Sequence, residues 1–201
     1  MERKPYIHRL YAVISILALL SSSLVSAAED KALESKVLVE YNKTTEQNDA
    51  LKFGTGGVHE LRISADRLSG ARIISAGSLI FMLPGDSYFS METVSESDYD
   101  FKDIDMSSYP ELILGLQGLT DEASDFHKEL RKSYVHVIKP DVSPKEIRIF
   151  NTANGKGYWA VGNKKSIIIL SSKEVDNQFS YFYIRNLSES DIEEIIINGL
   201  L

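Results

Sequence analysis

The sequence predicts an α+β fold, with an antiparallel β-meander sheet and two helices, one central and one C-terminal, packed on it. Three observations support this prediction. The last third of the chain holds short alternating segments separated by turns too short for a crossover connection, so neighbouring strands must be antiparallel. The middle of the chain carries apolar residues at helical spacing. A capped helical pattern closes the chain, and helices on one antiparallel sheet define the α+β class.

The first predicted strands lie between residues 36 and 64. Residues 36–41 alternate, with Val37, Val39 and Tyr41 on one side. Residues 42–52 are polar and are expected to form a loop, and residues 54–57 form a glycine-rich turn. Residues 58–64 alternate again and predict the second strand.

The next segment, residues 71–83, is apolar and predicts one or two buried strands around Gly77. Pro84-Gly85-Asp86 ends it with strong turn chemistry. Residues 88–94 predict a further strand, and residues 95–105 form an acidic connection.

A central helix is predicted from Ser108. Ser108 and Glu111 have the spacing of a capping box, and Pro110 is tolerated in a first helical turn. Gly115 and Gly118 each weaken the helix by about 1 kcal/mol relative to alanine. Two helices that meet near residue 120 therefore remain an alternative. The apolar stripe that predicts the helix consists of Leu112, Leu116, Leu119, Ala123, Phe126 and Leu130.

From residue 133 the apolar period changes to two, which predicts the meander. Asn154-Gly155 is the strongest hairpin signal, because both residues accept positive φ. Ser190 is then expected to cap a final helix with Glu193 as its reciprocal partner. The predicted meander strands span residues 134–138, 146–151, 158–161, 166–171 and 179–185, and the helical residues expected to face the sheet are Ile192, Ile195, Ile196 and Leu200.

The order of these elements resembles that of the Mog1/PsbP-like domains. The similarity covers the chain from about Val58 onward. It implies a single α+β domain with an accessory or binding role, often exported, and it transfers no catalytic residue. The features that carry it are Leu83-Pro84-Gly85 after an early strand, the helix from Ser108, the meander through Gly157-Tyr158-Trp159 and the closing helix from Ser190.

Residues 1–27 are predicted to be a secretory signal peptide, which leaves residues 28–201 as one globular α+β domain. Arg3, Lys4 and Arg9 precede an apolar run over residues 10–20, and residues 25–27 fit a small-x-small cleavage site. A transmembrane anchor is the alternative, but it needs about 20 apolar residues. The chain has no cysteine, so it lacks disulfides and a lipid-anchor site. The expected location is the periplasm or the exterior of a bacterium.

Charge limits the expected partners. The formal net charge is −7, and residues 1–27 hold one acid and three bases, so the chain that follows carries −9. No run of lysine and arginine is present to bind a polyanion. The charge therefore favours a basic protein partner over nucleic acid, and no stable membrane insertion is expected after cleavage.

Two groups of residues are candidate binding sites. The first is the acidic connection, with Tyr99 and Phe101 as aromatic anchors for a basic partner. Its carboxylates do not match the spacing of a calcium loop, and no metal or cofactor is predicted. The second is an exposed aromatic platform on the last strands, because only one face of a strand needs to pack under the helices. The acids of the first group are Asp98, Asp100, Asp103 and Asp105, and the platform would use Trp159, Tyr181 and Tyr183.

These observations favour an exported, non-catalytic binding or accessory protein of the cell envelope. An immunity-type inhibitor of a secreted toxin is one alternative, and a carrier of small molecules or lipids is another. A hydrolase with a dispersed site would use His59, His127 and His136. No nucleophile elbow, P-loop or zinc-protease motif supports an enzyme.

Overall fold

The computed structural model describes residues 36–41, 49–55, 59–75, 77–101, 106–120 and 122–200. It confirms an α+β fold with a large, mostly antiparallel, open sheet. The predicted signal peptide lies outside the described residues. Among the described helices, none is both long enough and apolar enough to cross a membrane.

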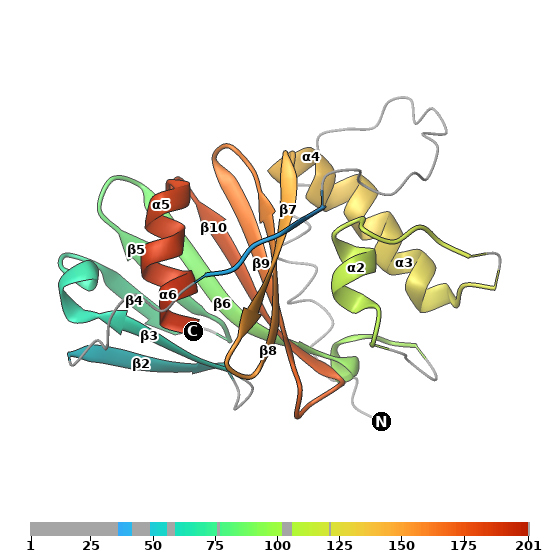
Figure 1. Ribbon diagram of the computed structural model, residues 1–201, viewed down its shortest axis with the longest axis horizontal. Coiled ribbons are helices and arrows are strands. Elements are labelled where there is room, and N and C mark those ends of the chain that lie inside the picture. The colour runs from blue at the N-terminus through green and yellow to red at the C-terminus, as the bar shows by residue number, and fades with distance from the viewer. Residues whose placement is uncertain are drawn as a thin grey trace, which may run out of the picture.

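The main sheet has eight strands in the order β1-β7-β8-β9-β10-β6-β5-β4, and β2 and β3 form a separate hairpin (Figure 1). Among the strand pairs of the described residues, only β1–β7 is parallel. Strands β7 to β10 form the predicted meander. The strands are β1 (Lys36–Leu38), β2 (Ala50–Thr55), β3 (His59–Ser64), β4 (Arg72–Ser75), β5 (Leu79–Leu83), β6 (Ser87–Ser95), β7 (Glu146–Thr152), β8 (Gly155–Val161), β9 (Lys165–Ser172) and β10 (Gln178–Arg185).

The helices form two groups. One group combines α2 (Tyr109–Ile113) with a continuous helix made of α3 (Asp125–Ser133), η4 (Tyr134–Ile138) and α4 (Lys139–Val142). The other is the C-terminal helix made of α5 (Glu189–Ile192), η5 (Glu193–Ile197) and α6 (Asn198–Leu200). Short 3₁₀ turns, η2 (Ala65–Leu68) and η3 (Glu96–Asp98), follow β3 and β6.

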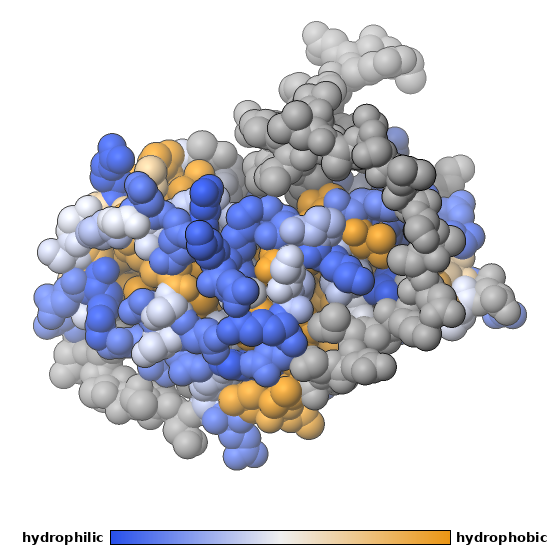
Figure 2. All heavy atoms as spheres, turned by 90° about the horizontal axis from the view of Figure 1, so that it is seen from above, coloured by the Kyte–Doolittle hydropathy of each residue, from blue (hydrophilic) through white to orange (hydrophobic). Residues whose placement is uncertain are grey.

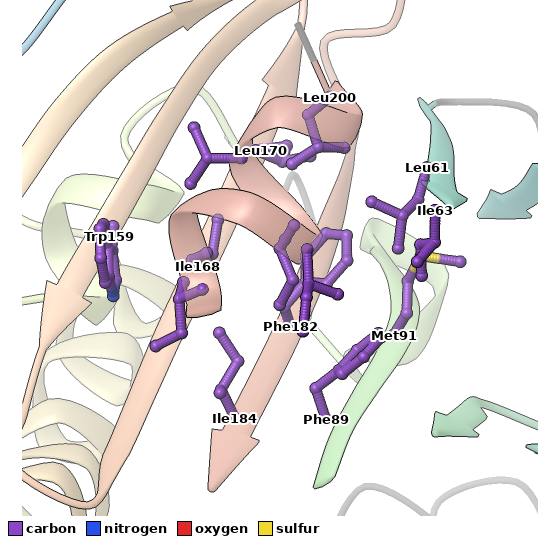
Figure 3. Packing of buried hydrophobic residues seen from close by; sticks show 14 of the residues in the cluster. Leu61, Ile63, Phe89, Met91, Trp159, Ile168, Leu170, Phe182, Ile184 and Leu200 are labelled. Atoms are coloured by element: carbon purple, nitrogen blue, oxygen red, sulfur yellow. The ribbon is translucent and has the colours of Figure 1, made fainter. Parts of the chain in front are cut away.

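The C-terminal helix and β3 cover one face of the sheet, which we call the α5 face. Figure 3 shows Leu200 of the helix and Leu61 and Ile63 of β3 turned toward the sheet residues Phe182 and Met91. All of these side chains are almost fully buried. The cluster continues across the sheet to Trp159 and Ile168, which are also fully buried.

The opposite face, which we call the α3 face, packs against the first helix group. Phe126, Leu130, Tyr134, Ile138 and Val142 line the continuous helix at intervals of four and are all buried. Their partners in the sheet are Ile147, Ile149, Tyr158, Ala160, Ile167, Ile169 and Phe179.

The predicted strand over residues 134–138 is wrong, because this segment is the π-helical turn η4. In an α-helix, four residues overshoot one turn by about 40°, so a four-residue spacing drifts around the helix. A wider π-helical turn counters that drift. Tyr134 and Ile138 therefore continue the buried helical face from α3 into α4, whereas His136, which lies between them in the sequence, is exposed.

The central helix predicted from Ser108 to Leu130 is also wrong as a single element. Two helices form instead, but α2 ends at Ile113 and α3 begins at Asp125, so they do not meet near residue 120 as the alternative expected. Gly115 takes a φ of +73°, its amide donates to the Leu112 carbonyl, and the next amide donates to the Glu111 carbonyl. This is a Schellman end, for which glycine is favoured. A Cβ at Gly115 would also collide with the Tyr134 ring, so the glycine ends α2.

The predicted helix caps differ from those in the structure. The Ser108 side chain makes no capping hydrogen bond at α2. The C-terminal helix begins two residues earlier than predicted, because Ser188 rather than Ser190 accepts from the Asp191 amide at 3.1 Å. The residues expected to face the sheet are nevertheless buried there.

Two predicted strand segments need further correction. Residues 50–52 are not loop but the start of β2. The segment around Gly77 does form two strands, but β4 is exposed along its whole length because it is an edge strand of the sheet.

The hairpin between β7 and β8 forms as predicted but for a different reason. The two turn residues are Ala153 and Asn154, and none of the positive-φ positions among the described residues falls there. Gly155 instead allows close approach of the neighbouring strand, because a Cβ would collide with the Ser171 carbonyl oxygen.

Candidate functional site

One row of neighbouring residues across the α3 face shows where its helical cover ends. On β7, β8 and β9 the row consists of Ile147, Ala160 and Ile167, all at most 2% exposed beneath the helices. The row continues through Tyr183 on β10, which is half-buried, and ends at Ile74 on β4, which is 44% exposed. Beyond Tyr183 the row consists of Ser90, Ile80 and Ile74, so apolar side chains recur after the cover has ended, with one serine between them.

The uncovered part of this face is the candidate functional site, and we call it the open face. Met82 is 37% exposed, and Tyr88 is half-buried beside it on β6. The Tyr88 and Tyr183 rings lie 6.0 Å apart between centroids. Apolar and aromatic side chains therefore gather on neighbouring strands that none of the described helices covers. The open face comprises Ile74, Ile80, Met82, Tyr88, Ser90 and Tyr183.

Polar contacts fix the border between the open face and the helices. The Tyr183 hydroxyl donates to Asp141 of α4 at 2.9 Å, and Lys165 of β9 pairs with the other carboxylate oxygen. Burial raises the pKa of the Tyr183 hydroxyl, and its hydrogen bond to Asp141 raises that pKa further. Tyr183 thus stays a neutral donor, held in place at the border.

A pocket of about 290 Å³ lies at one end of this region. It forms where β5 stops at Leu79 while β6 continues to Ser95. Burial raises the pKa of the Glu92 carboxyl, and the charge of Asp98 raises it further. Among the described residues that line the pocket, no histidine or second acid stands beside Glu92, so we do not assign acid–base chemistry to it. The lining residues are Gly54, Ser75, Gly77, Ser78, Leu79, Met91, Glu92 and Thr93.

The acidic connection is only partly available as a docking surface. The Asp98 carboxylate accepts from the Ser95 amide at 2.7 Å and completes a capping box at η3. Tyr99 turns inward, where its hydroxyl donates to that of Tyr109 at 3.2 Å. Asp100 is exposed, and Phe101 is 37% exposed against Phe126. Asp103 and Asp105 lie outside the described residues.

The predicted aromatic platform is divided between the two faces of the sheet. Trp159 belongs to the α5 face and is fully buried, so its assignment to an exposed platform is wrong. Tyr181 and Tyr183 share the α3 face, as predicted, with Phe179. Burial raises the pKa of the Tyr181 hydroxyl, and the neighbouring Glu92 charge raises it further. Of these residues, Tyr183 reaches the open face.

A network of charged groups surrounds Arg148 on β7. Its guanidinium is within 2.6 Å of both Glu146 and Glu189 and within 3.3 Å of Glu193. It also lies 4.8 Å from the Trp159 ring centroid. Burial opposes the charge, but hydrogen bonds to Glu189 and Glu146 outweigh it and raise the pKa of Arg148. Because the arginine is satisfied by these groups, we interpret the network as a clamp that holds α5 on the sheet.

The structure does not bring the three candidate catalytic histidines together. His59 of β3 is buried on the α5 face, with Nδ1 2.8 Å from the Ser180 hydroxyl. His127 and His136 belong to the helices on the opposite face. The sequence neighbours Ser124 and His127 meet only through a helix cap, in which the serine accepts from the His127 amide at 3.2 Å.

Sequence reasoning missed most residues of the open face. Residues 71–83 are apolar, and an apolar composition predicts burial. Hydrophilic side chains cover most of the surface seen in Figure 2, and apolar residues appear only in separate patches. Composition alone does not say which apolar strand residues remain uncovered.

No protein-family model matches this chain, and no curated protein matches it. The resemblance to Mog1/PsbP-like domains therefore stays a prediction.

Proposed function

We propose that this protein is an exported, non-catalytic binding protein of the cell envelope, and that the open face binds a protein partner. The observation that carries the proposal is the group of apolar and aromatic side chains that lies beyond the helical cover at the end of the row from Ile147 to Ile74. Uncovered apolar patches mark interaction sites in soluble proteins. The export part of the proposal rests on the signal-peptide pattern of residues 1–27.

The shape and composition of the open face favour a protein partner over a small ligand. It lies on neighbouring sheet strands rather than in an enclosed cavity, whereas small-molecule sites bury most of their ligand. Tyrosine and methionine are enriched in protein interfaces, and Tyr88, Tyr183 and Met82 lie together here.

Site-specific photo-crosslinking in intact cells tests this proposal. The full chain would carry p-benzoylphenylalanine in place of Met82, with the same substitution at Lys156 as a matched control on an exposed part of β8. We expect a discrete adduct with another protein from position 82 and none from position 156. Sequencing of the recovered protein should begin at residue 28 or 29.

A second surface is supported by the exposed Phe101 beside Asp100, which fits the basic partner predicted from the net charge. The same crosslinker in place of Phe101 separates the two surfaces. An adduct from position 101 alone would move the interface to the acidic connection. Absence of any adduct from both positions, or a folded precursor that stays uncut in the cytosol, would contradict the proposed function.

A further inference from the structure

A row of residues at one end of the open face carries positive charge. It runs Arg72, Met82, Tyr88, Arg185 and Lys165 across β4, β5, β6, β10 and β9. Partners in such a row point to the same face of the sheet. Lys165 is already paired with Asp141 at the border. The remaining two cations flank an apolar and an aromatic side chain.

Both arginines are exposed, and neither forms an ion pair with another of the described residues. Three strand spacings separate them, which places them about 14 Å apart. Asp86, in the turn between β5 and β6, is the acid nearest along the chain to this row. Two guanidinium groups with an apolar centre between them are therefore available to a ligand.

We propose that the open face receives an extended acidic segment of a protein partner, with two carboxylates that pair with Arg72 and Arg185. This inference rests on the proposed function of the open face. An extended chain advances about 3.3 Å per residue, so two acids four residues apart span about 13 Å. Alternate side chains of an extended segment point to opposite sides, so the residue midway between the two acids faces the sheet with them. An apolar side chain at that middle position would lie over Met82 and Tyr88. Guanidinium groups suit carboxylates because they can bond them in a bidentate manner.

The local charge of this surface differs from that of the whole molecule. The chain after residue 27 carries −9, which by itself favours a basic partner. Contacts at an interface depend on the nearest groups, because charges beyond about 10 Å are largely screened at 0.1 M ionic strength. The open face can therefore select an acidic segment within an acidic protein.

Peptide titration followed by amide NMR tests the inference on the purified mature protein. The probe is the capped peptide Glu-Thr-Val-Thr-Glu, and the controls are Lys-Thr-Val-Thr-Lys and Glu-Glu-Thr-Val-Thr. We expect shifts at β4, β5 and β6 from the first peptide, and weaker binding of both controls. Arg72→Gln and Arg185→Gln should each weaken the first peptide about fivefold. Lys173→Gln, an exposed cation in the β9–β10 turn, should change nothing.

Equal binding of the lysine peptide, no binding of any peptide, or no effect of the arginine substitutions would overturn the inference. A second titration, followed by the same amide NMR shifts, compares phosphatidylglycerol vesicles with phosphatidylcholine vesicles. If only the phosphatidylglycerol vesicles shift the open face, its anion comes from lipid and the inference is wrong. The two proposals can fail separately. If position 82 still crosslinks to a partner and Arg72→Gln does not change the yield, the proposed function holds and this inference is wrong.

Discussion

The two faces of the eight-stranded sheet differ in how far their cover extends. On the α5 face, a row from β6 to β8 through Met91, Phe182, Ile168 and Trp159 is at most 2% exposed. On the α3 face, Phe179 of β10 and Val94 of β6 are buried as well, but along the row from Ile147 the exposed fraction rises beyond β9 and reaches 44% at Ile74. Strands β5 and β6 are therefore held mainly by one of their two faces, whereas the edge strand β4 is exposed on both.

Simple dimensions explain the difference. Eight strands at about 4.8 Å spacing span about 34 Å between the first and the last, whereas a helix is about 10–12 Å wide. The group of α2 and α3 covers only part of that width. On the α5 face, the β2–β3 hairpin extends the cover beside the C-terminal helix. The comparison indicates that the α5 face stabilises strands β5 and β6, which leaves their other face available for binding.

The largest expected effect comes from adjacent residues of β5 that point to opposite faces. Phe81 is fully buried on the α5 face, stacked on Phe89 with 4.4 Å between ring centroids, whereas Met82 belongs to the open face. We expect Phe81→Ala to lower the free energy of unfolding by about 3–5 kcal/mol. Met82→Ala should lower it by about 0.5 kcal/mol or less. Urea denaturation of both variants measures the difference.

The same two variants can also contradict the inferred difference in packing between the two faces. If Met82→Ala destabilises the protein as much as Phe81→Ala, the open face is packed in solution and its proposed binding role has no surface to act on. Equal and small effects would instead mean that the α5 face is not the stabilising one.

Much of the fold could be predicted from the sequence because the strands are short and alternate clearly. The meander from β7 to β10 follows directly from its turns. The helices are harder to predict from the sequence. Gly115 affects the chain through its left-handed backbone conformation, which a propensity penalty does not describe. The segment Tyr134–Ile138 has apolar residues two apart and also four apart, so its period alone does not separate strand from helix.

The candidate site was less predictable than the fold. Alternation predicts the correct side of β10 for Tyr183, because side chains two residues apart in a strand share one face of the sheet. The exposure of Ile74 and Met82 depends on where distant helices end, and no local pattern contains that information. Trp159 shows the converse, because an aromatic residue suited to an interface is here part of the core.

A smaller effect is expected from the clamp that holds the C-terminal helix on the α5 face. Arg148→Met leaves Glu146 and Glu189 without their shared cation. Breaking a buried ion pair costs about 3–5 kcal/mol. The arginine side chain keeps 18% of its exposure, and solvent screening lowers the expected loss to about 2 kcal/mol. Arg62→Met is the control, because its pair with Glu60 is exposed, and it should cost about 0.5 kcal/mol or less.

Chemical denaturation of these two variants separates the contribution of ion pairing to stability from that of apolar packing in the cover of the α5 face. If Arg148→Met is as stable as the original chain, apolar contacts alone retain the helix and the clamp interpretation is wrong.

The smallest expected effect concerns pH and the attachment of β3 to the same face. Burial lowers the pKa of His59, and a backbone hydrogen bond to Ser171 opposes this only in part. The folded protein therefore prefers the neutral imidazole, which also contacts the Ser180 hydroxyl. This contribution to stability is complete above the unfolded pKa of about 6.5 and is lost as the pH falls from there toward the lowered folded pKa.

Urea midpoints between pH 8 and pH 5 measure this effect as a difference between the original chain and His59→Gln. We expect the original chain to lose more stability than His59→Gln over that interval. His136→Gln, at an exposed position on η4, should follow the original chain. A parallel decline for His59→Gln and the original chain would show that His59 does not couple pH to this face. In that case the attachment of β3 depends on Leu61 and Ile63 alone, and the contrast between the two faces rests on apolar burial.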